Sequence, residues 1–500
     1  MILNWVSGLS LLLAIGSLIL YYLSGGNSFD NSDALYLPTL FRDVLQQGGQ
    51  FKDWYLTPAP YYFPDYGLYF LAFLLVSGIY EQIIVFTIIQ CFILFGLVYV
   101  LTKQIDQISA FQIASCITIC LVWFAVTVDQ PFIFLLISAH HYGAFISAIL
   151  LVYLWNVYES KNKKPFFLLG LISIVTFLST LSDNLFLIQA LLPFFIACIA
   201  SHFFSNSFQI KGLASSFLYP FFFGIAGSIS YKWLVVYQTR YSGHTGFDQF
   251  SKNINDLILM AGNIVSKNYI LLAIILLYLI LCACLIWQLL QGKGIAWVSK
   301  KLLFLSLFSL ASIGVTFAAV SLVEQMPVSE RYLISAYTWP VIMVGLFAAA
   351  YFGQRAQFGI CLMSALIAIS LCFSGVHQLN KLGYVGKNYS PELACLDDAL
   401  QYEELHNGVA QYWDAKALQA FSRLELKLAQ HFGDLSEHRW ITSANYFRDR
   451  YDFVIISTNA QPQYKITREQ VIALNGLPRK EYICGHRILL IYGKDQLRVK

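Results

Sequence analysis

The sequence predicts an α-helical polytopic membrane protein of about eleven transmembrane helices with a small C-terminal α/β soluble domain. Hydrophobic residues make up 58% of the 500 residues and charged residues only 12%, whereas a soluble domain carries about 25% charge. Residues 377–500 hold 16 of the 32 Lys and Arg residues and 14 of the 28 Asp and Glu residues. We therefore expect a membrane domain at 1–376 and a soluble domain at 377–500. The net charge of +4 is too small to indicate nucleic acid as a partner.

Apolar runs of about 20 residues are long enough to cross the hydrocarbon core of a membrane as helices. Such runs occupy 4–23, 82–102, 108–127, 140–158, 166–182, 184–202, 214–236, 269–290, 302–322, 332–351 and 358–376. The segment 67–80 is shorter, at about 14 residues, which favours a surface or re-entrant helix over a span.

The distribution of positive charge predicts the orientation of these helices. With the N-terminus inside, the inner loops contain Lys103, Lys161, Lys163, Lys164, Lys211, Lys293, Lys300, Lys301 and Arg355. The short outer turns are nearly free of Lys and Arg, with Arg331 as the exception. An odd number of spans then places the first loop, 24–81, and the C-terminal domain together on the outer side.

The first outer loop is long, aromatic and acidic. It combines many Tyr, Phe, Trp and Pro residues with Asp30, Asp33, Asp43, Asp53 and Asp65. A connector between two helices needs none of these features. We expect the loop to lie on the membrane surface and to present carboxylates at the level of the lipid headgroups, where an enzyme acting on a lipid-linked phosphate would need them.

Three features together resemble the GT-C-type glycosyltransferases: an N-terminal helix, the helix start DALYLPTLFRDV in a long outer loop, and the acidic, proline-rich turn TPAPYYFPDYGLYF. That family includes protein O-mannosyltransferases and lipid A aminoarabinose transferases, polytopic enzymes that take a sugar from a polyprenyl-phosphate donor. The resemblance covers the first loop and the general helix layout to about residue 350, and it is weaker in the tail. It implies inverting transfer of a sugar to a glycan, lipid or protein acceptor.

By this resemblance, Asp33 is expected to be the general base that takes the proton of the acceptor hydroxyl. Asp65 is the second expected catalytic residue, orienting the acceptor or a divalent metal. Many relatives carry an Asp-Glu pair here, whereas Ala34 follows Asp33 in this chain. The alternative is that Asp30 or Asp33 caps a helix beginning at Ala34. No cofactor is indicated with certainty, and a divalent metal stays open because a loop with several aspartates suits either case.

Asp183 and the pair Arg331-Tyr332 are expected to bind substrate at the outer ends of helices. An ionisable residue near membrane depth indicates function, although Ser-Asp-Asn also suits a tight turn between helices. Arginine suits phosphate through its two-pronged geometry, and family members often have Arg-Tyr at this place. An anchor at the membrane interface is the alternative for this pair.

Two further substrate-binding candidates are the pair His140-His141 and Arg240. Paired histidines at an outer helix end suit phosphate, while a metal site would need more ligands at fixed spacing. A structural role is the alternative for the histidines. Arg240 lies in the outer loop 237–267, which suits either contact with the donor headgroup or an amphipathic surface helix.

The tail reads as a small α/β domain. DFVIIST and HRILLIYG are typical of buried strands, and the segments CLDDALQYEELH and after Tyr412 are typical of helices. Cys395 and Cys484 are its only cysteines and are expected to form a disulfide in an oxidising compartment, with two separate buried thiols as the alternative. The tail has no phosphate-binding glycine loop, HExxH or GxSxG motif.

Two other classes of protein compete with the transferase. A transporter or flippase of lipid-linked sugars tends to show broken helices and polar sites at the membrane midplane in repeated halves. This chain shows no convincing internal repeat, and its acidic residues cluster in the outer loops rather than within helices. A polysaccharide polymerase or ligase carries its large outer loop late rather than after the first helix. The outer cysteine pair and the absence of a eukaryotic retention signal predict a bacterial inner membrane, with the first loop and the C-terminal domain in the periplasm.

Overall fold

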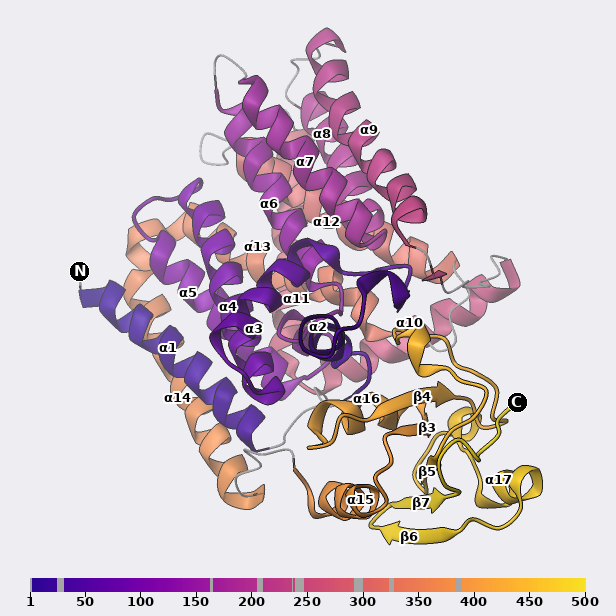
Figure 1. Ribbon diagram of the computed structural model, residues 1–500. Coiled ribbons are helices and arrows are strands. Elements are labelled where there is room, and N and C mark those ends of the chain that lie inside the picture. Colours follow the sequence, from indigo (N-terminus) through magenta and orange to yellow (C-terminus); the bar gives the residue numbers. More distant parts are fainter. Residues whose placement is uncertain are drawn as a thin grey trace.

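Long apolar helices form the N-terminal part of the molecule, and a small mixed sheet with its own helices lies against one end of them (Figure 1). This arrangement comes from a computed structural model. It describes residues 2–24, 31–161, 165–204, 210–235, 237–238, 247–291, 300–322, 328–382 and 389–500.

Each of the apolar runs expected from the sequence contains a helix. These helices are α1 (Ile2–Leu23), α4 (Ile79–Lys103), α5 (Ala110–Thr127), α6 (Tyr142–Glu159), α7 (Phe166–Ser182), α8 (Leu192–Phe204), α9 (Ile210–Leu234), α11 (Tyr269–Leu290), α12 (Lys300–Leu322), α13 (Ile334–Phe352) and α14 (Gln357–Leu382). Within the described residues, 7 helical segments are long and apolar enough to cross a membrane, one of them comprising α13 and α14, and two shorter apolar segments comprise α7 and most of α8. The helical architecture is thus confirmed and is consistent with a membrane domain, and the number of spans stays a prediction.

Small residues allow the closest approaches between these helices. α1 packs against α14, and α7 packs against α9. A Cβ atom on Gly227 of α9 would lie 2.3 Å from the carbonyl oxygen of Phe177 in α7, and one on Gly375 of α14 would lie 3.0 Å from that of Ser17 in α1. Any larger side chain at either glycine would force the two helices apart.

The first outer loop is folded rather than extended. It contains α2 (Tyr36–Gln46), the short strand β1 (Tyr55–Leu56), a π-helical turn (Tyr62–Tyr66) and α3 (Gly67–Leu75). β1 pairs in parallel with β2 (Tyr237–Gln238), which precedes α10 (Phe247–Ser266). α3 has 9 residues and exposes Phe70, Leu71, Leu74 and Leu75. A helix this short with an exposed apolar face suits the membrane surface and cannot cross the hydrocarbon core.

The C-terminal domain is built on a five-stranded sheet in the order β4-β3-β5-β7-β6. Its strands are β3 (Asn407–Gln411), β4 (Lys427–His431), β5 (Phe453–Ser457), β6 (Lys480–Cys484) and β7 (Arg487–Ile491), and its helices are α15 (Pro391–Tyr402), α16 (Tyr412–Phe421) and α17 (Arg468–Asn475). β3 is parallel to β4 and β5, while β7 is antiparallel to β5 and β6. The small α/β domain is therefore confirmed. Its preceding helix α14 continues to Leu382, past the expected domain boundary at 376.

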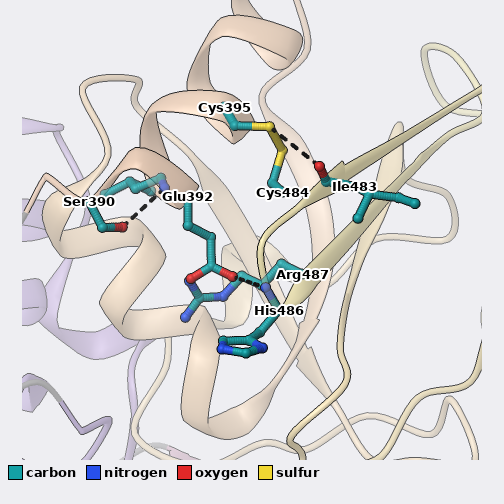
Figure 2. The surroundings of a disulfide bond; sticks show 8 residues. Ser390, Glu392, Cys395, Ile483, Cys484, His486 and Arg487 are labelled. Atoms are coloured by element: carbon teal, nitrogen blue, oxygen red, sulfur yellow. Dashed lines mark hydrogen bonds and ion pairs between the residues drawn. A yellow bond between two sulfur atoms is a disulfide. The ribbon is translucent and has the colours of Figure 1, made fainter.

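A disulfide joins Cys395 of α15 to Cys484 at the end of β6, which confirms the expected pairing (Figure 2). Glu392 adds a second link beside it. Its carboxylate accepts hydrogen bonds from the backbone N–H of His486 at 2.6 Å and from Nη1 of Arg487 at 2.9 Å. Together these links fix α15 to the β6–β7 turn.

The C-terminal domain contacts the first outer loop directly. Asp43 of α2 is buried and accepts hydrogen bonds from Nε1 of Trp54 at 2.7 Å and from the hydroxyl of Tyr446 at 3.0 Å. The backbone N–H of Tyr55 donates to the carbonyl of Thr442 at 2.8 Å. These contacts place the loop and the domain on the same side of the helices, as the odd number of spans implied.

Candidate functional site

A cavity of about 490 Å³ lies where the outer loops of the membrane domain meet the C-terminal domain. Segments far apart in the sequence supply its polar and aromatic wall, since it is lined by Asp33, Tyr61, His141, Asp183, Arg331, Tyr332 and Trp440 among others. Five of the expected site residues therefore meet at one cavity. Most of the remaining wall is apolar, as in cavities that bind organic ligands.

Asp33 projects into this cavity from the turn before α2. Its Oδ2 accepts a hydrogen bond from Nη1 of Arg331 at 3.2 Å, and its Oδ1 accepts one from the hydroxyl of Tyr412. The helix turn itself is closed by Asn31, whose Oδ1 accepts from the backbone N–H of Ala34 at 2.9 Å, while α2 begins at Tyr36 without a side-chain cap. Helix capping as the role of Asp33 is therefore wrong. Asp30 lies outside the described residues.

Arg331 and Tyr332 form one edge of the cavity, on a short 3₁₀ turn before α13. The Arg331 guanidinium lies 5.3 Å from the centroid of the Tyr332 ring. Gln189 fixes this turn by donating from Nε2 to the carbonyl of Tyr332 at 2.7 Å. Nε of Arg331 is buried and has no hydrogen-bond partner among the described residues. A guanidinium has five N–H donors, so Arg331 has donors to spare for an anionic ligand.

His141 and Asp183 form a buried pair in the cavity wall beside Tyr332, whose ring centroid lies 5.2 Å from that of His141. Nδ1 of His141 lies 2.6 Å from Oδ2 of Asp183, and the two residues are 5% and 3% exposed. Oδ1 of Asp183 accepts the backbone N–H of Leu185 at 2.9 Å, so Asp183 also closes the turn between helices. The tight turn expected of Ser-Asp-Asn is thus present in the structure, and substrate binding by Asp183 stays a prediction.

Two expected site residues, His140 and Asp65, are not among the residues that line the cavity. His140 stacks on Phe134, with ring centroids 4.9 Å apart, and its Nδ1 lies 2.6 Å from the carbonyl of Ser138, which suits a structural role. Arg240 lies outside the described residues. Asp65 is fully buried behind the cavity, against Gly143, where an added Cβ would come within 2.4 Å of its Oδ2.

The environment of Asp65 is unfavourable for a charged carboxylate. Neither carboxylate oxygen has a hydrogen-bond partner of normal geometry among the described residues. Burial, reinforced by the nearby charge of Asp183, raises the pKa of Asp65 to about 7. Asp65 is therefore a buried residue outside the cavity lining, and its catalytic role stays a prediction.

The residues that the C-terminal domain supplies to the site were not predicted from the sequence. Tyr412 follows β3 directly, at the carboxyl end of a parallel strand, which is where α/β sheets place their ligand-binding side chains. The adjacent aromatic residues Tyr412 and Trp413 were the available signal, because β3 itself has no β-branched run that would mark it as a strand. Trp440 comes from an irregular loop, and no pattern in the sequence marks it.

Lys416, beside the cavity, was also not predicted from the sequence. It is completely buried between α16 and α2, with its Nζ 3.4 Å from Oγ1 of Thr39 and 4.9 Å from the centroid of a Trp54 ring. Burial lowers the pKa of Lys416 to about 7, although the nearby Asp33 and Asp43 carboxylates oppose this shift.

This cavity differs in chemistry from a cavity of similar volume among the helices. A cavity of about 500 Å³ between α5, α11, α13 and α14 is lined almost entirely by apolar side chains, with no charged residue. No group of three or more His, Cys, Asp or Glu residues that could hold a metal ion occurs among the described residues.

A comparison of the chain with protein-family models gives no match, and a comparison with curated proteins gives none either.

Proposed function

We propose that this protein is a membrane glycosyltransferase that moves a sugar from a polyprenyl-phosphate donor to an acceptor hydroxyl, with inversion at the anomeric carbon. The observation that carries the proposal is the cavity between the outer loops and the C-terminal domain, where Arg331 meets two carboxylates, Asp33 and Asp183. In this one cavity, the cation can stabilise the negative charge of the leaving phosphate. The carboxylates can help to remove the proton of the incoming hydroxyl.

The cationic edge suits the phosphate of the donor. As the bond between the sugar and the phosphate breaks, negative charge grows on the phosphate oxygens. Arginine matches these oxygens with paired N–H donors, and such charge-assisted hydrogen bonds are stronger where water is excluded. Arg331 lines the cavity and, among the described residues, donates to Asp33 from Nη1, so further guanidinium donors remain for this role.

The same cavity supplies proton acceptors for the incoming hydroxyl. Asp33 and the pair His141–Asp183 all line it, with Asp33 beside Arg331. The role of Asp33 as the base stays a prediction. Tyr61, Tyr332 and Trp440 give the wall broad aromatic faces, as pockets for organic ligands commonly have.

The position of the cavity suits a donor whose lipid stays in the membrane. The loops that line it leave the ends of α5, α6, α7 and α13, and α3 exposes an apolar face nearby in the same first loop. The C-terminal domain covers the other side, where it meets an acceptor approaching from solution: a glycan, a lipid headgroup or a protein. The proposal places this side in the periplasm of a bacterium, and a disulfide-bonded domain fits that oxidising compartment.

The proposal is tested by comparing surface glycans and lipid-linked sugars by mass spectrometry in the wild type, a deletion strain, and strains carrying Asp33→Asn or Arg331→Ala. The expected result is that the deletion loses one sugar from its acceptor and that both variants lose it at normal protein abundance. Arg355→Ala is the matched control, because Arg355 is exposed and far along the chain from the cavity residues.

A deletion strain with unchanged glycans would refute the proposal. So would Arg331→Ala and Asp33→Asn strains that keep every sugar that the deletion loses.

A further inference from the structure

We propose that His141, paired with Asp183, is the catalytic base of the transfer, and that Asp33 is a positioning residue that holds Arg331. This inference rests on the proposed function and deepens it, because it assigns the proton transfer to a pair of residues that sequence reasoning gave only a substrate-binding role.

The hydrogen bond between the two side chains fixes which ring nitrogen of His141 can act. A carboxylate accepts hydrogen bonds and has no proton to donate at neutral pH. The 2.6 Å contact with Asp183 therefore places the proton of the neutral ring on Nδ1 of His141. Nε2 is then left with a free lone pair. His141 makes no other side-chain hydrogen bond among the described residues and lines the cavity, so this lone pair is available to a substrate hydroxyl.

The surroundings hold the His141 ring in one orientation. The rings of Tyr61 and Tyr332 lie against it, with centroid distances of 5.5 Å and 5.2 Å. Asp183 is held in turn by the backbone N–H of Leu185 at 2.9 Å. A base whose partner orients it in this way has the arrangement expected of general-base pairs.

Asp33 is arranged differently. Both of its carboxylate oxygens already accept hydrogen bonds, one from Arg331 and one from Tyr412. Taking a proton from the acceptor would weaken its ion pair with Arg331 at the moment when the guanidinium must stabilise the leaving phosphate. The geometry therefore assigns Asp33 to orienting Arg331.

The proposed transfer forms one bond, breaks one bond and moves one proton. The acceptor oxygen forms a bond to the anomeric carbon of the sugar while its proton moves to Nε2 of His141. The bond between the anomeric carbon and the phosphate oxygen breaks, and its electron pair stays on the phosphate of the departing polyprenyl phosphate. Arg331 faces this growing charge, and Asp183 stabilises the imidazolium that forms on His141.

Other groups near His141 affect its protonation and must be considered in any pH experiment. The titratable and charged groups around the pair are Asp33, Tyr61, Asp65, His140, Arg331 and Tyr332. An imidazole base loses its activity once the ring is protonated, whereas a carboxylate base loses its activity only at a more acidic pH.

The test measures transfer between pH 5 and pH 9 in membranes from the deletion strain that carry the full-length protein. The donor is the lipid-linked sugar fraction extracted from that strain. For the wild type we expect the rate to fall at least tenfold from pH 8 to pH 5. His141→Gln is expected to lower the rate at pH 8 by about 10²–10⁴-fold, and Asp33→Asn is expected to raise the KM for the donor while keeping the fall at acid pH.

A second variant separates catalysis from folding. His141 has a φ of +67°, a conformation that glycine adopts freely, so His141→Gly should fold and leave space for added imidazole. Rescue of transfer by imidazole, increasing with its concentration, is the expected result. His486→Gln, an exposed histidine of the C-terminal domain, is the matched control and should match the wild type.

The outcomes distinguish the inference from the proposed function. A wild-type protein that transfers sugar at equal rates at pH 8 and pH 5, or a His141→Gln variant within threefold of the wild type, would overturn the inference alone. Wild-type membranes without any transfer above those of the deletion strain would overturn the proposed function as well.

Discussion

Replacing Lys416 with methionine should stabilise the protein near neutral pH and remove a pH dependence from its stability. Lys416 is fully buried, and burial lowers its pKa from 10.5 to about 7. The unfolded chain keeps this proton up to about pH 10.5, whereas the folded protein loses it near pH 7. Between these values the unfolded state binds more protons, so stability rises with pH and is lost as the pH falls toward 7.

The expected magnitude follows from the size of this shift. A difference of roughly 3.5 pKa units corresponds to about 5 kcal/mol between the two protonation states. The free energy of unfolding of the wild type should therefore rise by up to about 1.4 kcal/mol per pH unit above pH 7, or up to about 3 kcal/mol between pH 7 and pH 9. Methionine cannot titrate, and Thr39 keeps a hydrogen bond because its Oγ1 donates to the carbonyl of Leu35 at 2.7 Å.

The assay is urea unfolding of the full-length protein in detergent at pH 7, 8 and 9, followed by tryptophan fluorescence, which reports on Trp54 beside Lys416. The difference in the free energy of unfolding between the wild type and Lys416→Met should be largest at pH 7 and should become smaller by up to about 3 kcal/mol at pH 9. Lys427→Met, at an exposed lysine of β4, is the control and should run parallel to the wild type. Parallel curves for the wild type and Lys416→Met would refute the account of Lys416 as a buried, easily deprotonated lysine.

Three further substitutions probe other parts of the structure. Tyr412→Phe removes the hydroxyl that donates to Asp33, a charge-assisted bond of about 1.5–3 kcal/mol, so transfer measured in membranes should fall at least tenfold while the protein remains folded. Cys395→Ser breaks the bond to Cys484 across 89 residues and should lower the free energy of unfolding by about 4–5 kcal/mol, a loss that a reductant reproduces in the wild type only. The pKa of Asp65 is raised from 3.8 to about 7 in the folded protein. Between these pH values the folded protein keeps a proton that the unfolded chain has lost, so the free energy of unfolding falls as the pH rises from 4 to 7. Asp65→Asn should remove that fall, about 4 kcal/mol in total, in the same unfolding assay.

The helices of the membrane domain were predictable because the bilayer sets their length and composition. A run such as 269–290 has few polar residues and no alternative to a helix in lipid, and α11 has these same bounds. The central strand β5 was predictable for a related reason, since both faces of Phe453–Ser457 are buried. β3 was not, because Asn407–Gln411 has no β-branched run and owes its burial to neighbouring strands.

The candidate site was predictable in part. The chemical type of Arg331, Asp183 and His141 marked them as unusual in apolar surroundings, and they do meet at one cavity. The partners of each residue could not be read, because they come from loops far apart in the chain. Lys416 shows the limit most clearly, since a lysine on a short helix predicts an exposed face, and only the docking of α16 on α2 buries it.

The most direct test of the proposed transferase uses purified full-length protein in liposomes that contain the lipid-linked sugar extracted from the deletion strain, together with extracted acceptor. The account predicts that the sugar leaves its lipid, that free polyprenyl phosphate appears in equal amount, and that Arg331→Ala abolishes both changes. A lipid-linked sugar that stays intact and only changes leaflet would contradict the account and identify a flippase.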